Sequence, residues 1–289
     1  MGFIGSHIAE ALLRQRHSVR IVDDFSTGKP ANIEPFREKI ELFTLDIASG
    51  QGLSDAFRGA DYVIHEAAIP SVPKSMRDPV ASNRANVDGT LQVLVAARDA
   101  GVKRLVYASS SSLYGDSPTL PKHEGMAPDP LSPYGAQKLF AEMYCRVFWR
   151  AYKLETVALR YFNVFGPRQD AESQYSGVLA KFIPAILQDR QPTIYGDGLQ
   201  SRDFTFVANV VDANLLACLA NRNRQAKQHR WRRPRAIHHS QCRNPESRSV
   251  LLWCGVEQYR AHAAGAGNWD AAHQFVIWIV LPPDGQFIF

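Results

Sequence analysis

The first 165 residues alternate between helical and strand-like patterns of hydrophobic and polar positions. Apolar side chains recur every three or four residues at 5–16 and 86–100, which predicts amphipathic helices, and a further helix is expected from Ser132-Pro133. Short apolar runs at 19–22, 40–45, 60–65, 104–108 and 156–161 predict strands. Strands separated by helix-length segments are typical of an α/β fold with a Rossmann-like, doubly wound parallel sheet.

The alternation of predicted helices and strands becomes less regular after residue 165, and the composition changes at residue 222. A helix at 178–187, a turn at 195–198 and a closing helix at 209–220 predict a small C-terminal substrate lobe. Residues 222–235 then hold seven Lys/Arg and no acid. We therefore divide the chain into a first domain at 1–165, a partial lobe at 166–221 and an anomalous tail at 222–289.

Charge and composition exclude several classes of protein. The net charge of +5 comes from residues 222–289, so a nucleic-acid-binding face on the domain that holds the motifs is not expected. The longest strongly apolar run, 275–281, is far below the roughly 20 residues of a membrane helix. The first residues do not resemble a secretory signal, so we expect a cytoplasmic protein. The four cysteines have no spacing typical of a disulfide framework or a metal site, and we expect no metal.

Gly2-Phe3-Ile4-Gly5 comes directly before the first predicted helix. Glycines at such a helix start let the backbone approach a pyrophosphate, which the free N–H groups can bind. Asp23 ends the next predicted strand, where an acid binds ribose hydroxyls and repels a 2′-phosphate. This combination favours NAD over NADP. The alternative is that the glycine spacing is a common one without function and that Asp23 is a solvated residue at the end of a strand.

Tyr134 and Lys138 are one turn apart on the helix after Ser132. A lysine ammonium and a nicotinamide cation near a phenol favour the phenolate, so the pair predicts a base. The run Ser109–Ser112 follows a buried-type strand, and its hydroxyls could share a proton with that base. Taken singly, Tyr134 and Lys138 also fit a pair of side chains on the surface of a helix, and the serine run also fits a polar turn.

Together, these segments resemble the extended short-chain dehydrogenase/reductase family, in particular UDP-glucose and UDP-N-acetylglucosamine 4-epimerases. The similar stretches follow the family's order over roughly residues 2–220. They are Gly2–His7, Asp23–Gly28, Leu45–Ile47, His65–Ala68, Asn86–Thr90, Tyr107–Gly115, Tyr134–Lys138, Arg160–Asn163 and Ser201–Phe204.

The resemblance implies a role for each matching position. The implied catalytic residues are Tyr134, Lys138, Ser110 and Ser111. The implied contacts to NAD are Gly2, Phe3, Ile4, Gly5, Asp23, Asp24, Ser26, Thr27, Gly28, Asp46, Ile47, Ala67, Ala68, Asn86, Tyr134 and Lys138. The implied contacts to a UDP-sugar are Ser110, Ser111, Asn163 and Arg202.

The implied activity is 4-epimerisation of a UDP-hexose or UDP-N-acetylhexosamine. Tyr134 removes the proton of the sugar 4-hydroxyl, NAD takes the hydride, and the hydride returns to the other face of the ketone. The resemblance also implies a homodimer through helices 86–100 and 133–151. A dehydratase is the nearest rival, but that class has an Asp–Glu pair where this chain has Ser111-Ser112. A non-catalytic NAD-binding protein and an inactive gene fragment remain alternatives.

Two departures from the family pattern change the expected fold. Family members have a hydrophobic strand and one more glycine before the position of Gly2, so we expect the sheet to lack its central first strand and the strands beside it to lack a partner. After Asn221 no family pattern continues, and we hypothesise an out-of-frame translation over 222–289. The strand-like run at 275–281 is predicted to promote aggregation.

Overall fold

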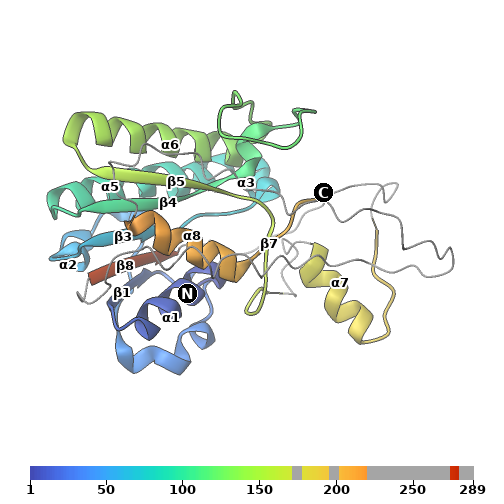
Figure 1. Ribbon diagram of the computed structural model, residues 1–289, viewed down its shortest axis with the longest axis horizontal. Helices are drawn as coiled ribbons and strands as arrows, with labels where there is room; N and C mark the ends of the chain where they lie inside the picture. The colour runs from blue at the N-terminus through green and yellow to red at the C-terminus, as the bar shows by residue number, and fades with distance from the viewer. Residues whose placement is uncertain (171–177, 195–201, 220–273, 280–289) are drawn as a thin grey trace. The chain divides into compact units, whose positions relative to one another are not determined.

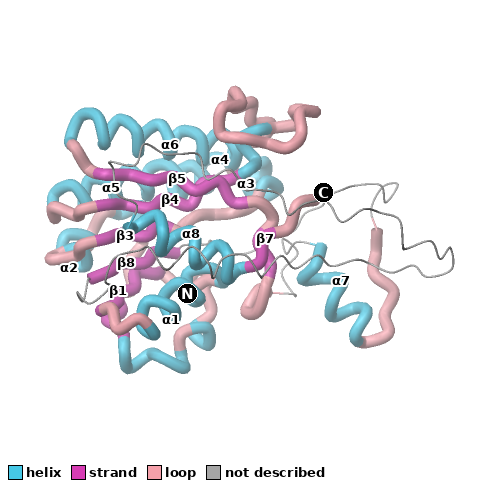
Figure 2. The backbone as a smooth tube through the Cα atoms, in the orientation of Figure 1, coloured by secondary structure: helices cyan, strands magenta, loops and turns pink. Residues whose placement is uncertain are grey.

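Parallel strands and the helices that cover them make up most of the computed structural model, which describes residues 1–170, 178–194, 202–219 and 274–279. The described residues belong to one compact unit. The main sheet has six strands in the order β2-β1-β8-β3-β4-β5. Figures 1 and 2 show β1, β8, β3, β4 and β5 side by side. The bounds of these strands are β1 Ser18–Asp23, β2 Ile40–Phe43, β3 Tyr62–His65, β4 Arg104–Ser110, β5 Glu155–Tyr161 and β8 Gln274–Ile279.

The strand β8 fills the centre of the sheet. It pairs in parallel with β1 on one edge and with β3 on the other, so that Ile277 lies opposite both Ile21 and Ile64. The expectation that β1 and β3 would lack a partner is therefore wrong. The strand-like run predicted at 275–281 overlaps β8, while the out-of-frame origin of the tail stays a hypothesis.

The longer helices match the predicted positions to within a few residues. The loop expected after β3 instead contains two short helices, α3 and α4. They form because Ser71 and Asp78 accept hydrogen bonds from the first-turn N–H groups of Lys74 and Ala81, and each helix has proline in its first turn. The helices are α1 Phe3–Arg14, α2 Leu53–Phe57, α3 Val72–Arg77, α4 Pro79–Asn83, α5 Gly89–Asp99, α6 Pro133–Tyr152, α7 Val178–Leu187 and α8 Val207–Leu219. The 3₁₀-helices are η1 Pro30–Asn32, η2 Glu34–Lys39, η3 Ile47–Ser49 and η5 Ser111–Tyr114, and η4 Arg84–Asp88 is a π-helix.

Both faces of the sheet are buried, as parallel sheets require. On β3, Val63 belongs to a hydrophobic cluster with residues of α2, α5 and α6. Its neighbour Ile64 belongs to a second cluster with residues of α1 and α8, on the opposite face. On β4, Leu105 and Val106 divide in the same way. The alternation of side chains along each strand thus produces one core on each face.

Arg104 fixes the C-terminal end of α8. Its Nη1 donates to the carbonyl oxygens of Ala217 at 2.8 Å and Cys218 at 2.9 Å, and its Nε donates to Glu155 at 2.8 Å. These bonds satisfy carbonyl groups that have no partner within the helix. The helix α8 is therefore held against the start of β4 and β5.

A second, small sheet pairs β6, Val164–Phe165, with β7, Thr205–Phe206, in parallel. The predicted helix at 178–187 is α7, and the predicted turn at 195–198 lies outside the described residues. The division at 165 and 221 stays a prediction. No helix in the described part of the chain is long and apolar enough to cross a membrane.

The central place of β8 predicts the effect of a proline at Ile277. Every N–H of an interior strand points to one neighbour or the other, so Ile277→Pro removes a ladder bond and leaves a carbonyl of β1 or β3 unsatisfied. We expect the free energy of unfolding, measured by urea denaturation, to fall by about 1–3 kcal/mol. Ile277→Val keeps the N–H and is the control. Equal stability of the two variants would show that β8 does not occupy this place in solution.

Candidate active site

The parallel strands end in polar residues at one edge of the main sheet. Asp23 ends β1, Glu66 follows β3, Ser110 ends β4 and Tyr161 ends β5. Ligands of open α/β sheets bind outside the carboxyl ends of the strands. The sequence-predicted residues Asp23 and Ser110, on different strands, are therefore brought to the edge where a cofactor and a substrate would bind.

Tyr134 lies in the first turn of α6. The helix begins after Ser132, whose Oγ accepts from the N–H of Gly135 at 3.1 Å, and the N–H of Tyr134 donates to Ser75 Oγ on α3 at 3.0 Å. Gly135 is required here because a Cβ would lie 2.8 Å from the carbonyl oxygen of Ser112. The helix start, α3 and the serine segment are thus packed against one another around Tyr134.

Lys138 is buried one turn further along α6. Its Nζ donates to the carbonyl oxygen of Ala108 at 2.7 Å and lies 4.8 Å from the centre of the Tyr107 ring and 5.9 Å from that of Tyr134. Burial lowers the pKa of Lys138 to about 8. The ammonium is therefore close to its titration at neutral pH and depends on the charges around it.

The chain's own groups do not make Tyr134 acidic. Burial raises the pKa of Tyr134 to about 12, a hydrogen bond with Ser110 opposes this rise, and the charge of Glu66 adds to it. The predicted fall in the pKa of Tyr134 is therefore absent from the protein alone. The cationic nicotinamide ring is the remaining charge in the predicted mechanism that would favour the phenolate.

The serine run divides its hydroxyls between two surroundings. Ser109 is buried and donates to Glu142 Oε1 at 2.5 Å, while the Oγ atoms of Ser110 and Ser112 lie 2.5 Å apart. Ser109 and Ser110 point to opposite faces because side chains alternate along a strand. Ser109 thus faces α6 through Glu142, whereas Ser110, the last residue of β4, acts on the Tyr134 phenol at the strand end, where Ser111 begins the turn η5.

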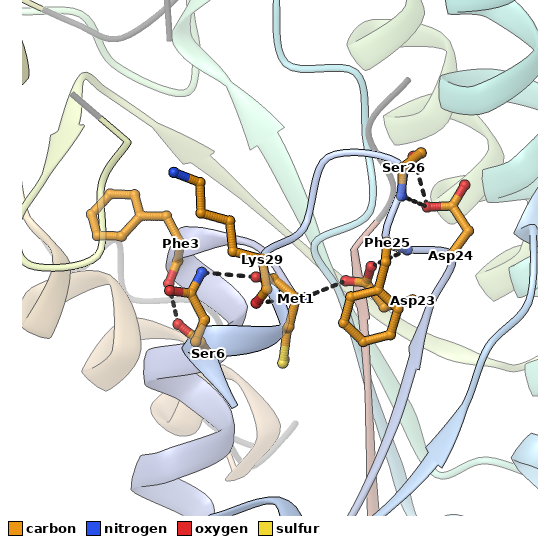
Figure 3. Close-up of polar contacts among 9 residues, drawn as sticks. Met1, Phe3, Ser6, Asp23, Asp24, Phe25, Ser26 and Lys29 are labelled. Carbon is orange, nitrogen blue, oxygen red and sulfur yellow. Dashed lines mark hydrogen bonds and ion pairs between the residues drawn. The ribbon is translucent and has the colours of Figure 1, made fainter. Parts of the chain in front are cut away.

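Figure 3 shows Asp23 beside the start of α1. Gly2 is the N-cap of that helix, whose first-turn N–H groups have no acceptor within the helix and can bind an anion. Asp23 Oδ1 accepts from the N–H of Phe25 at 2.8 Å, and Oδ2 lies 3.7 Å from the Met1 nitrogen. Burial raises the pKa of Asp23 to about 6.

Asp23 fits the ribose of a dinucleotide. Its Oδ2 is buried and accepts no hydrogen bond from the described residues, so a ribose hydroxyl would supply the missing donor. The same loop leaves Thr27 Oγ1 buried without a hydrogen bond within the described chain. Gly28 packs so closely that a Cβ would lie 2.5 Å from the Met1 nitrogen. Asp24 closes the loop by accepting from Ser26 N–H at 2.9 Å and Ser26 Oγ at 2.7 Å.

Asp46 and Ile47, the predicted adenine contacts, differ in their surroundings. Asp46 caps η3 by accepting from Ala48 N–H at 2.9 Å and forms an ion pair with Arg84 at 2.7 Å. The Ile47 side chain is wholly buried, and a Cβ on Gly89 would lie 2.7 Å from its Cδ1. The Ile47 side chain thus packs in the core, so a contact with adenine would be made by the Ile47 backbone.

Asn86 supports the loop that follows β3. Its Oδ1 accepts from Ile69 N–H at 2.6 Å, and its Nδ2 donates to Gln137 Oε1 at 2.8 Å. These bonds hold the segment with buried Ala67 and Ala68 against α6. The Asn86 side chain thus supports this loop, and its place along the cofactor path stays a prediction.

The small sheet brings the predicted substrate contacts Asn163 and Arg202 near each other. Asn163 Nδ2 donates to the carbonyl oxygen of Asp203, the residue after Arg202, at 2.8 Å, and both predicted residues are exposed. Phe162 stacks on Tyr114 with 6.4 Å between ring centres, which links this segment to the end of the serine run.

Sequence reasoning missed a cluster formed by Glu66, Tyr161 and Asn214. The Tyr161 hydroxyl donates to Glu66 Oε1 at 2.6 Å, and Asn214 Nδ2 donates to the Tyr161 oxygen at 2.6 Å. The available signal was an acid directly after a buried strand, within the matched stretch His65–Ala68. Across the described residues, no group of His, Cys, Asp and Glu is arranged to hold a metal ion.

Comparison with known proteins shows what this arrangement is similar to. The model of the NAD dependent epimerase/dehydratase family matches residues 1–230. A UDP-glucose 4-epimerase of Mycolicibacterium smegmatis is 39% identical over 217 residues, which cover 73% of this chain and 69% of that protein. A UDP-N-acetyl-alpha-D-glucosaminuronate decarboxylase of Bacillus cytotoxicus is 35% identical over 222 residues, 75% of this chain and 68% of its own length.

Among solved structures, the UDP-N-acetylglucosamine 4-epimerase of Methanobrevibacter ruminantium M1, in complex with UDP-N-acetylmuramic acid, is 43% identical with a TM-score of 0.73. The match covers 76% of this chain and 71% of that one. The family match spans most of the chain, and the relatives share its α/β fold. The chain therefore belongs to the NAD-dependent epimerase/dehydratase family of nucleotide-sugar enzymes, whose cofactor is NAD.

Proposed function

We propose that the chain is an NAD-dependent UDP-sugar 4-epimerase with Tyr134 as its catalytic base. The observation that carries this proposal is the convergence of Tyr134, Lys138 and Ser110 at the carboxyl end of β4. Lys138 is bonded to Ala108 on that strand, and Ser110 at its end lies close enough to the Tyr134 phenol to oppose the rise in its pKa. A phenol, a hydroxyl and an ammonium so placed can move the proton of a sugar alcohol.

Each residue has a distinct part in the proposed reaction. Tyr134 takes the proton of the sugar 4-hydroxyl, and Ser110 donates a hydrogen bond to the same oxygen. Lys138 contributes positive charge beside the phenolate. Bound NAD supplies a hydride acceptor and donor at this edge of the sheet. Tyr134 then returns the proton after the hydride reaches the opposite face of the 4-keto sugar.

The serine segment favours epimerisation over dehydration. A dehydratase needs an acid and a base to remove water, and the positions after Ser110 are Ser111 and Ser112. The Ser112 hydroxyl is itself bonded to Ser110 at 2.5 Å. The segment therefore contains no carboxyl group to protonate a leaving hydroxyl.

The proposal includes the substrate and the assembly. We propose a UDP-hexose or UDP-N-acetylhexosamine, with Asn163 and Arg202 contacting its nucleotide part. We also propose a homodimer through α5 and α6, because exposed Phe140, Met143 and Val147 are spaced along one face of α6. The cytoplasmic location stays a prediction.

One experiment separates the candidate functions. The full chain is purified, released NAD is quantified, and interconversion of UDP-glucose with UDP-galactose and of the N-acetylated pair is followed by chromatography. We expect bound NAD and interconversion of at least one pair. Bound NAD without any turnover would indicate a binding protein. Insoluble protein would indicate an inactive fragment. A 4-keto-6-deoxy or decarboxylated product would indicate a different activity within the family.

Removal of the Tyr134 hydroxyl tests the base. We expect Tyr134→Phe to lower kcat by about 100- to 10,000-fold, the range for a general acid–base group, while NAD stays bound. Tyr144→Phe, on the same helix, is the matched control and should keep its activity. Full activity in the Tyr134→Phe variant would rule Tyr134 out as the base.

The charge of Asp23 tests the ribose contact. Asp23→Asn keeps the acceptor for Phe25 N–H but loses the charged acceptor at Oδ2. We expect the Kd for NAD to rise about 10- to 100-fold and the preference over NADP to shrink, because hydrogen bonds to charged groups are worth about 1.5–3 kcal/mol. Calorimetric titration with both nucleotides measures this, with Asp55→Asn on the exposed face of α2 as the control.

The raised pKa of Asp23 gives the same contact a pH dependence. At pH 7 the carboxyl is mostly ionised, and the charged acceptor is lost as pH falls through about 6. The affinity of the wild type for NAD should therefore weaken below that pH, whereas the affinity of Asp23→Asn should not change there. Parallel pH curves for the two proteins would contradict the assignment.

A further inference from the structure

Glu142 of α6 accepts hydrogen bonds from two neighbouring strands. Its Oε1 accepts from Ser109 Oγ of β4 at 2.5 Å and from Arg160 Nε of β5 at 2.9 Å, and its Oε2 accepts from Arg160 Nη2 at 2.8 Å. Ser109 and Arg160 lie opposite each other in the register of β4 and β5. One carboxylate thus joins the helix to both strands at the same level of the sheet. The proposed mechanism uses neither Glu142 nor Arg160.

Arg160 also binds the last residue of the serine turn (residues 109–114). Its Nη1 donates to the Tyr114 hydroxyl oxygen at 2.8 Å, and its guanidinium carbon lies 5.0 Å from the centre of the Tyr114 ring. Tyr114 ends η5 and is 3% exposed. The Glu142–Arg160 ion pair therefore holds the serine turn at both ends, through Ser109 at the first and through Tyr114 at the last.

The middle of the serine turn packs against the start of α6. A Cβ on Gly135 would lie 2.8 Å from the carbonyl oxygen of Ser112, so the turn and the helix meet directly beside Tyr134. Ser110 and Ser112 are linked within the turn by their Oγ atoms, which lie 2.5 Å apart. A shift of either end of the turn would therefore move these hydroxyls relative to the Tyr134 phenol.

Lys138 and Glu142 attach α6 to consecutive residues of β4. They are four residues apart and lie on one face of the helix. Lys138 Nζ donates to the Ala108 carbonyl oxygen at 2.7 Å, and Glu142 accepts from Ser109. The helix therefore cannot slide along β4 without breaking both bonds. The position of Tyr134, in the first turn of this helix, depends on the same attachment.

Stability alone does not account for an ion pair at this place. Glu142 is 8% exposed, and the Arg160 side chain is 18% exposed. The cost of desolvating such a pair is about as large as the attraction between its charges, so apolar residues of similar volume often give equal stability. The pair differs from apolar residues because its hydrogen bonds have direction and so fix the atoms that they join. The network is therefore suited to set positions.

We propose that Glu142 and Arg160 are positioning residues whose ion pair holds the serine turn at both ends and so keeps its hydroxyls within reach of Tyr134. The inference rests on the proposed function of Tyr134 as a base. The two residues act through the serine turn and not by contact with the sugar. Because a misplacement of about 1 Å can cost about 100-fold in rate, loss of the pair should lower kcat more than it weakens binding.

Tyr114→Phe is the mildest test of the network. It removes the hydroxyl that accepts from Arg160 and keeps the ring that stacks on Phe162. We expect kcat in the chromatographic assay to fall about 10- to 100-fold, because one end of the serine turn is no longer bonded. KM for the UDP-sugar and the amount of bound NAD should stay near the wild-type values, since loss of an interaction that matters for the chemical step lowers kcat alone.

Glu142→Gln tests the ion pair itself, and Glu155→Gln is its matched control. Glu155 pairs with Arg104 between β5 and β4 at the opposite end of the same two strands. Each substitution replaces a carboxylate that bonds an arginine with a neutral amide, so both should lower the free energy of unfolding in urea. Only Glu142→Gln should lower kcat, by about 10- to 100-fold.

Hydrogen–deuterium exchange measures the hold on the serine turn without turnover. Peptides that cover residues 109–115 are followed by mass spectrometry in the full chain with NAD bound. We expect their amide hydrogens to exchange about 2- to 10-fold faster in Glu142→Gln and Tyr114→Phe, the change that corresponds to the loss of one hydrogen bond. In Glu155→Gln they should exchange at the wild-type rate.

The outcomes separate this inference from the proposed function. If the wild type interconverts a UDP-sugar pair and Glu142→Gln and Tyr114→Phe keep its kcat, the positioning role is overturned, even where exchange in the turn is faster. It is overturned as well if Glu155→Gln lowers kcat equally, or if exchange in the turn does not change. A wild type that converts no UDP-sugar removes the proposed function first, and the network then has only a structural role.

Discussion

An interior strand of a parallel sheet must be hydrogen-bonded along both edges, and the fold depends on how β8 meets this requirement. It joins β1 and β3, which are not neighbours without it. Strands lie about 4.8 Å apart, so β8 sets a spacing of roughly 10 Å between the ends of β1 and β3. Asp23 and Glu66, at those ends, are thereby separated by the width of one strand.

Burial shifts the pKa values of three ionisable groups in the candidate site toward neutral pH. The pKa of Asp23 is raised to about 6 and that of Glu66 to about 7, while that of Lys138 is lowered to about 8. Such shifts are typical of functional sites because a group near its titration point responds to each charge placed beside it. A cofactor with a cationic ring and anionic phosphates would change all these equilibria at once. The final pKa values of these groups would therefore depend on the charges of the bound molecules as well as on the protein.

Local patterns were enough to predict the strands β1 to β5 and the start of α6. Strand hydrophobicity and the Ser132-Pro133 cap are properties of a few adjacent residues. The helices α3 and α4 were missed because their caps, Ser71 and Asp78, lie in a segment rich in loop-forming residues. The partners of Glu66 could not be predicted, since Tyr161 and Asn214 are distant in the sequence and meet only through packing. Asn86 illustrates the same limit, because its residue type fits both a ligand contact and the loop support that the structure gives it.

The place of β8 also sets the order in which this chain can fold. Its pairing joins residues 62–65 to 275–278, which closes a loop of more than 200 residues. Contacts so distant in the sequence make folding slow, and a ribosome releases the C-terminal partner last. Until then, β1 and β3 each present an unpaired edge that another chain can join. The fraction of this protein that reaches its native sheet therefore depends on how long β1 and β3 remain unpaired, as well as on final stability.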